Sequence, residues 1–176
     1  MHALVVFESM YGNTKVIAEA VADGLSSRIP VEITEVGKAP MVIGDDVALL
    51  VVGAPTHAHG MSNPDTRRTA ADRADKERGI ASTSTGLREW LAGLAMAPSS
   101  VAVAAFDTRL KGPGLLWGSA AKSAEGQLRK AGAHVVTPAQ SFFVAGPRGP
   151  VYEGLAEGEI DRARRWGERL ATELPS

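Results

Sequence analysis

The sequence contains no cysteine among its 176 residues. That absence excludes a disulfide framework, thiolate zinc sites, cysteine-ligated iron–sulfur clusters and a cysteine nucleophile, and it fits a reducing compartment. No apolar run approaches the ~20 residues that a membrane-spanning helix needs. The segment 1–7 lacks the basic region of a signal peptide. We therefore expect a cytoplasmic protein without a membrane span.

Charge of one sign is also missing, because 19 basic residues stand against 20 acidic ones and the formal net charge is −1. No basic field argues for nucleic acid as a partner, and no strong acidity argues for a basic one. Aromatic residues make up only 5% of the chain. The length suits one domain, and we expect residues 1–176 to form a single one.

Short apolar segments alternate with stretches of helical periodicity along the chain. Ala3–Phe7 and Val47–Val52 are fully apolar, as expected of strands covered on both faces, whereas residues 31–36 alternate like an edge strand. The other expected strands lie at 101–106, 134–136 and 141–144, with an interruption near Pro138, and the expected helices at 16–25, 87–94, 119–132 and 160–174. Joined by right-handed crossovers, this pattern predicts an α/β three-layer sandwich around a five-stranded parallel sheet.

Some helix ends and faces can be predicted as well. Ser84 or Thr85 is the expected N-cap of the helix at 87–94, and Ser119 that of the next helix. Ile160 and Trp166 share the apolar face of the closing helix, so we expect both to face the sheet.

Ligands of open parallel sheets bind beyond the carboxyl ends of the strands, which directs attention to the loops 8–14, 54–63 and 107–118. The first loop runs directly into a helix and carries the hydroxyls of Ser9 and Thr14 with a glycine and an asparagine between them. Together with the N–H groups of a helix start, these residues form an anion cradle. A cradle of neutral donors suits a phosphate monoester.

Other functional sites fit the sequence less well. The P-loop pattern is absent, and no Gly-x-Ser-x-Gly elbow supports a hydrolase. His57 and His59 form a possible metal pair, but no further ligand lies near them in sequence, so we predict no metal site. Glu8 stands alone after the first strand, which argues against the acid pair of a receiver domain. The segment 62–81 mixes charges of both signs, and a solvated loop or short helix is expected there.

Three segments resemble the flavodoxin family. Glu8–Thr14, with the sequence ESMYGNT, is similar to the family's phosphate loop, Ser/Thr-x-Thr-Gly-Asn-Thr, with Tyr11 in place of a threonine. Gly53–Thr56 resembles the start of the second flavin loop, and Ser141–Val144 with the helix after it resembles the last strand and helix. The resemblance covers nearly the whole chain. It implies a flavodoxin-like fold with strand order 2-1-3-4-5 and FMN as the cofactor.

The resemblance also implies which residues contact the FMN, and none of them acts as a catalytic acid or base. The phosphate would be held by Ser9, Met10, Tyr11, Gly12, Asn13 and Thr14. The isoalloxazine ring would lie along Pro55, Thr56, His57, Ala58, His59 and Gly60. Its pyrimidine end would face Asp107, Thr108 and Arg109, with Phe106 beside them.

Two features depart from the family pattern. The aromatic residues that usually sandwich the ring are missing from the second and third loops, apart from Trp117 at a distance. The third loop carries Arg109 and Lys111, whereas flavodoxins crowd carboxylates around the flavin. Because a nearby cation stabilises an anionic reduced flavin, we expect this flavin to be easier to reduce than that of a typical flavodoxin.

Three functions remain open at this point. The favoured one is an FMN-binding electron carrier that serves redox partner proteins. The second is an FMN-dependent reductase that passes electrons from NAD(P)H to a quinone or a similar small acceptor. The third is a flavin-free interaction module on the same fold. Whether the protein is a monomer or a homodimer is undecided.

Overall fold

The computed structural model describes residues 1–57, 60–73, 84–96, 101–111, 118–145 and 154–174. Its strands are β1 (His2–Phe7), β2 (Val31–Glu35), β3 (Val42–Ile43), β4 (Val47–Pro55), β5 (Ala95–Met96), β6 (Ala102–Leu110), β7 (His134–Val135) and β8 (Gln140–Val144). Its α-helices are α1 (Asn13–Ser26), α2 (Pro64–Arg73), α3 (Leu87–Gly93), α4 (Ala120–Lys130) and α5 (Glu159–Thr172), and a 3₁₀ turn spans Val36–Lys38.

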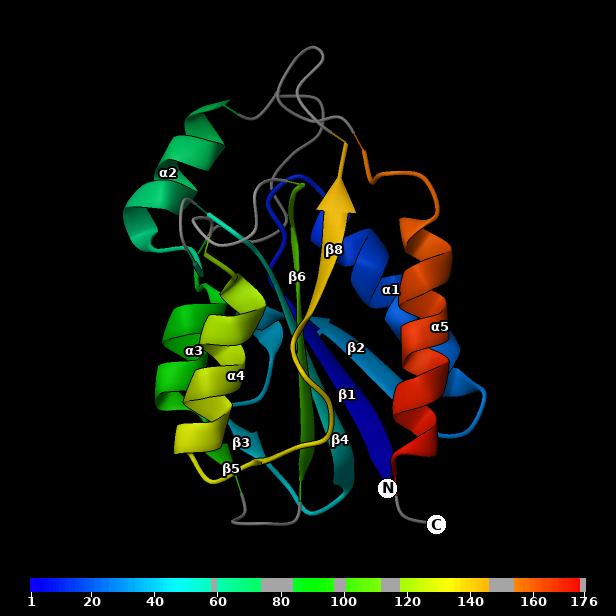
Figure 1. Ribbon diagram of the computed structural model, residues 1–176. Coiled ribbons are helices and arrows are strands. Elements are labelled where there is room, and N and C mark those ends of the chain that lie inside the picture. The colour runs from blue at the N-terminus through cyan, green and yellow to red at the C-terminus, as the bar shows by residue number, and fades with distance from the viewer. Residues whose placement is uncertain (58–59, 74–83, 97–100, 112–117, 146–153, 175–176) are drawn as a thin grey trace.

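The main sheet is parallel, with the order β2-β1-β4-β6 followed by β7 and β8. β7 pairs with the start of β6 and β8 with its end, so the two together occupy one broken strand position. When β7 and β8 are counted as one strand, the sheet has the predicted order 2-1-3-4-5. The interruption predicted near Pro138 lies between β7 and β8. The small parallel pair β3–β5 was not predicted. All carboxyl ends of the main sheet point to the edge at the top of Figure 1.

Helices cover both faces of the sheet, which explains why its central strands are apolar throughout. Ala3, Val5 and Phe7 of β1 pack into a cluster with α1 and α5, whereas Leu4 and Val6 pack into a second cluster with α3 and α4. The three-layer prediction is therefore confirmed (Figure 1). Among the described helices, none combines the length and the apolar character needed to span a bilayer.

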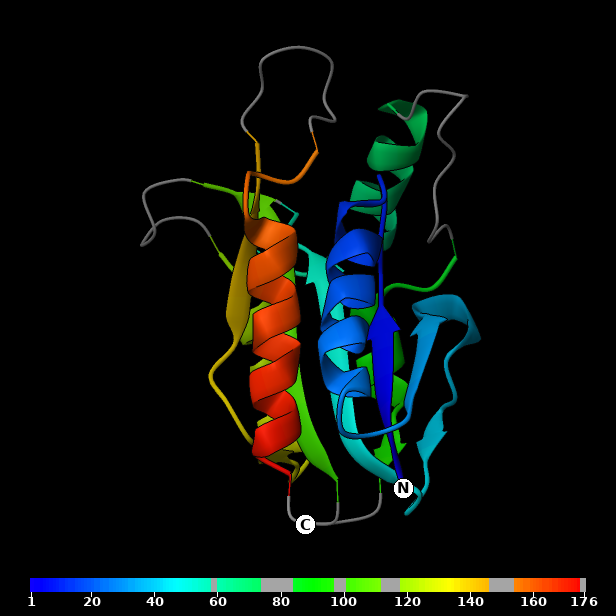
Figure 2. The same ribbon diagram turned by 90° about the vertical axis from the view of Figure 1, so that its right-hand side faces the viewer.

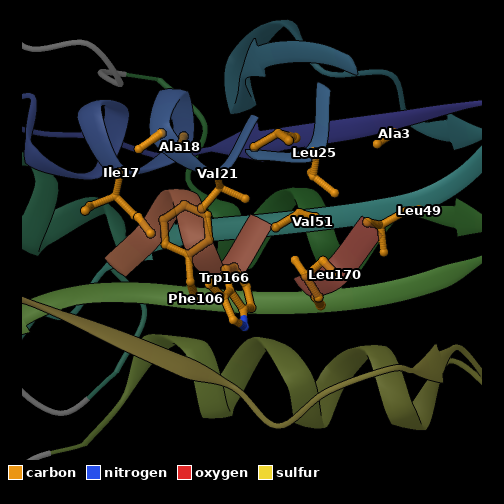
Figure 3. Packing of buried hydrophobic residues seen from close by; sticks show 14 of the residues in the cluster. Ala3, Ile17, Ala18, Val21, Leu25, Leu49, Val51, Phe106, Trp166 and Leu170 are labelled. Atoms are coloured by element: carbon orange, nitrogen blue, oxygen red, sulfur yellow. The ribbon is translucent and has the colours of Figure 1, made fainter. Parts of the chain in front are cut away.

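Three aromatic rings fill the layer between the sheet and the α1–α5 pair. Phe106, Phe142 and Trp166 meet edge to face, with ring centroids 6.0–6.1 Å apart, a favourable geometry for aromatic pairs. Figure 3 shows Phe106 and Trp166 beside the aliphatic side chains of α1. The predicted core position of Trp166 is confirmed, since its exposed fraction is 3%.

The helices α1 and α5 approach each other through two glycines (Figure 2). A Cβ on Gly24 would lie 2.1 Å from the carbonyl oxygen of Arg164, and one on Gly167 would lie 2.2 Å from that of Val21. Neither distance is possible for a real side chain, so this contact between backbones requires glycine on both helices.

Local expectations were wrong at several places. Ile160 is half exposed, because the neighbouring Glu159 turns inward and accepts a hydrogen bond from the Phe143 N–H at 2.8 Å. The N-cap of α3 is Gly86, not Ser84 or Thr85. β6 continues past Phe106 to Leu110, because its pairing with β4 and β8 continues there. The prediction of Ser119 as the cap of α4 is confirmed, since its Oγ accepts from the Lys122 N–H at 3.1 Å.

The glycine contact gives a stability prediction. Gly24→Ala should lower the free energy of unfolding by about 3 kcal/mol, because the added methyl group forces the two helices apart. Gly126→Ala is the matched control: it lies within α4, and a Cβ there would meet no atom within 4 Å, so alanine should stabilise the helix by roughly 0.5–1 kcal/mol. Urea unfolding of both variants measures the difference. Equal effects of the two substitutions would contradict the close contact.

Candidate functional site

The first loop at the carboxyl edge wraps around the start of α1. Ser9 is fully buried, and its Oγ accepts hydrogen bonds from the N–H groups of Gly12 at 3.1 Å and Lys15 at 3.4 Å. Gly12 has φ = 92°, a left-handed conformation that favours glycine. A Cβ built on it would meet no atom within 4 Å, so this side of the loop opens away from the protein.

Side-chain hydrogen bonds fasten the three loops to one another. The hydroxyls of Thr14 in the first loop and Thr108 in β6 lie 2.7 Å apart. At the end of β4, Thr56 donates its hydroxyl to the Asp107 carboxylate at 3.0 Å and its N–H to the Thr108 carbonyl at 2.9 Å. The three regions predicted to meet at this edge therefore do so.

Asp107 is the central acceptor of the third loop. It is fully buried, and besides the Thr56 hydroxyl its Oδ2 accepts from the Ser119 hydroxyl at 2.5 Å and the Ala121 N–H at 3.1 Å. Ser119 and Ala121 begin α4, where a negative charge is favoured by the helix dipole. The carboxylate thus ties β6 to the start of α4.

His57 and Gly60 pair through their backbones in the second loop. The His57 N–H donates to the Gly60 carbonyl at 2.8 Å, and the Gly60 N–H donates back at 3.0 Å. Burial of the ring, and to a lesser degree the positive charge of Arg67, lowers the pKa of His57 below its usual 6.5, so the imidazole is neutral at pH 7. The predicted contacts Ala58 and His59, as well as Trp117, lie outside the described residues.

Next to these loops lies a polar group made of the buried residues Glu8, Ser62 and Arg67 and the partly exposed Glu89, here called the Glu8–Arg67 cluster. The Ser62 hydroxyl donates to Glu8 Oε1, and the Leu87 N–H donates to Glu8 Oε2 at 2.7 Å. Arg67 Nη1 lies 2.9 Å from Ser62 Oγ and 3.1 Å from Glu89 Oε2. Burial raises the pKa of Glu8 above 4.5, against the lowering effect of its two hydrogen bonds and of Arg67.

Sequence reasoning missed this cluster. Glu8 was read as a lone carboxylate and the segment 62–81 as solvated, whereas Arg67 is only 5% exposed. The described part of that segment does contain the short helix that was expected, α2. A signal for its start was present, since Asn63 precedes a proline, and Asn63 Oδ1 accepts from the Thr66 N–H at 2.9 Å.

The remaining predicted residues lie in different environments. Tyr11 donates its hydroxyl to the Ala70 carbonyl in α2 at 3.2 Å, and Met10 is buried. Arg109 lies over the ring of Phe143, 5.9 Å from its centroid, with Nη1 3.4 Å from the Gly118 carbonyl. The side chain of Phe106 belongs to the core, so only its backbone reaches the edge.

Two polar atoms of these loops stand out. Within the described residues, Nε2 of His57 and Oδ1 of Asp107 are buried and have no hydrogen-bond partner. Buried polar atoms are nearly always bonded. An unpaired acceptor and an unpaired ring nitrogen at the same edge therefore favour a polar ligand there.

Comparison with known proteins agrees with this arrangement. A family model described as Flavodoxin matches residues 5–168, and no curated protein sequence matches the chain. The solved structure of a flavodoxin from the domain Archaea is similar, with 20% identity, a TM-score of 0.65 and 98% of each chain covered.

Two Bacillus cereus structures are similar as well. For oxidised flavodoxin 1 the identity is 16% and the TM-score 0.68, and for oxidised flavodoxin 2 they are 16% and 0.66. Each comparison covers 99% of this chain and 100% of the other. At these identities the structures show a common fold.

The environment of Glu8 predicts a pH-dependent stability. Because its pKa is raised in the folded state, the native protein binds more protons than the unfolded chain between pH 4.5 and the folded pKa. The contribution of Glu8 therefore falls as the pH rises through that window. Glu8→Gln removes this ionisation, so the free energy of unfolding of the variant relative to wild type should rise across the window and level off above it.

Urea titrations between pH 4 and 8 measure this difference. Glu19→Gln, at an exposed position of α1, controls for the loss of one surface charge. If the free energy of unfolding differs between wild type and Glu8→Gln by the same amount at every pH from 4 to 8, burial does not penalise the charged form of Glu8.

Proposed function

Because this chain belongs to the flavodoxin family, we propose that residues 1–176 form one flavodoxin-like domain that binds FMN and carries electrons. Flavodoxins pass electrons to redox partner proteins and are typically cytoplasmic, and we propose the same for this chain. Family membership favours this role over the NAD(P)H-dependent reductase and over the flavin-free module. The observation that carries the proposal is the convergence of the three loops through the Thr14–Thr108 and Thr56–Asp107 hydrogen bonds.

The first loop fits a phosphate. Gly12 is open on its outer side, and the first N–H groups of a helix have no partner inside the helix. The Thr14 hydroxyl is bonded to Thr108, but a hydroxyl both donates and accepts. Thr14 can therefore keep accepting from Thr108 while it donates to a phosphate oxygen. Ser9 supports the loop from inside, by holding the N–H groups of Gly12 and Lys15.

The second and third loops fit the polar edge of the flavin ring. That edge offers N–H donors and carbonyl acceptors, and the unpartnered atoms Asp107 Oδ1 and His57 Nε2 are suited to them. When bound, the flavin itself accepts and releases the electrons. The residues proposed here bind it, orient it and set the electrostatic potential around it.

One prediction of the proposed function concerns the phosphate. Thr14→Val should weaken FMN binding by roughly 10–150-fold, because a hydrogen bond to a charged group contributes about 1.5–3 kcal/mol. The affinity for riboflavin, which lacks the phosphate, should fall much less. Quenching of flavin fluorescence measures both affinities.

Thr108→Val is the matched variant, since it removes the same hydroxyl–hydroxyl bond but leaves the loop hydroxyl in place. We expect it to weaken FMN and riboflavin binding by similar factors. If Thr14→Val and Thr108→Val reduce FMN affinity equally, Thr14 does not contact the phosphate. If the wild-type protein binds no FMN, the proposed function is wrong.

The expectation of an easily reduced flavin stays a prediction. Arg109 lies at the third loop and Lys111 is exposed beyond it, and no carboxylate among the described residues of that loop other than Asp107 opposes them. A potentiometric titration of the FMN complex should give a hydroquinone couple above that of flavodoxins measured under the same conditions.

A further inference from the structure

Arg67 places a buried cation behind the first and second loops. Its side chain is 5% exposed and contacts Ser62 and Glu89. A Cβ on Gly86 would lie 2.2 Å from Arg67 Nη1, so the guanidinium packs directly against the backbone at the start of α3. An arginine remains charged at any ordinary pH, which means that this position holds a permanent positive charge inside the protein.

The cation is connected to both loops. Ser62, which accepts from Arg67, donates in turn to Glu8, and Glu8 is followed directly by Ser9 of the first loop. In the second loop, the positive charge of Arg67 helps to lower the pKa of His57. The field of Arg67 therefore reaches the groups proposed to surround the flavin.

The nearby carboxylates compensate this charge incompletely. Glu89 is 37% exposed, so water screens it, and burial disfavours the charged form of Glu8. Arg88 is exposed and its charge is screened as well; its guanidinium donates to the carbonyls of Met61 and Ser62. Among the described residues, His57 is a further titratable group that the charge of Arg67 affects, and it is neutral at pH 7.

We propose that Arg67 is an electrostatic tuning residue of the flavin site, whose buried charge favours the reduced flavin over the oxidised one. The inference rests on the proposed function, because it requires FMN at the three loops. Reduction by one electron from a chemical reductant adds one negative charge to the flavin. A fixed cation behind the loops stabilises that charge without moving and without contacting the cofactor.

The size of the effect follows from Coulomb's law. Two unit charges about 10 Å apart in a medium with an effective dielectric constant near 20 change an equilibrium roughly tenfold. Arg67→Met should therefore weaken the affinity for reduced FMN relative to oxidised FMN about tenfold, which equals a fall of about 59 mV in a one-electron midpoint potential. Potentiometric titration of the FMN complex measures this shift.

Arg68→Met is the matched control, because Arg68 is the next residue of α2 and its side chain is 73% exposed. We expect no change in potential from it, since water screens an exposed charge. Arg67→Lys keeps the charge and should keep most of the potential. Glu89→Gln removes a carboxylate from the same cluster and should raise the potential.

Opposite shifts from Arg67→Met and Glu89→Gln support the proposal, since a merely structural role would weaken both redox forms alike. Equal shifts from Arg67→Met and Arg68→Met, or a fall in potential with Glu89→Gln, would overturn it. If Arg67→Met does not fold, the sign of the Glu89→Gln shift decides. FMN binding with an unchanged potential in these variants refutes this inference alone, whereas a wild-type protein that binds no FMN refutes the proposed function as well.

Discussion

Two buried carboxylates at the carboxyl edge of the sheet organise the structure around them. Glu8 follows β1 and Asp107 lies near the end of β6, and both are fully buried. A buried carboxylate is costly unless donors surround it. Each one recruits a serine hydroxyl and one backbone N–H at the start of a helix: Ser62 and Leu87 for Glu8, Ser119 and Ala121 for Asp107. The need to satisfy these two groups thereby fixes where α3 and α4 begin relative to the sheet.

The two faces of the sheet are consequently held in different ways. The side covered by α1 and α5 is closed by apolar side chains, three aromatic rings and a pair of glycines. The side covered by α3 and α4 has its own apolar cluster, but near the loops it is held by hydrogen bonds to carboxylates. The loops proposed to bind the cofactor lie above this polar end, where hydrogen bonds set their positions.

Most of the sheet and its order followed from the sequence, because apolar strands and amphipathic helices carry local signals. The buried polar contacts did not follow from the sequence, because the residues that form them are far apart in the chain. Glu8 and Leu87 are separated by 79 positions, and no periodicity links them. The burial of Arg67 could not be predicted either, since a charged residue in a polar helix is usually exposed. Ile160 was misplaced because Glu159, a residue that is typically exposed, took the inward position at the start of α5.

The glycine contact between α1 and α5 has a consequence for the order of folding. Gly24 and Gly167 are 143 positions apart (167 minus 24), yet their helices touch backbone to backbone. Contacts between segments so distant in sequence require closure of a long loop, and that cost slows their formation. During synthesis α1 emerges long before α5, so the apolar face that α1 turns toward α5 stays uncovered until residues 159–172 have been made. α5 is therefore the element that completes the part of the core it shares with α1.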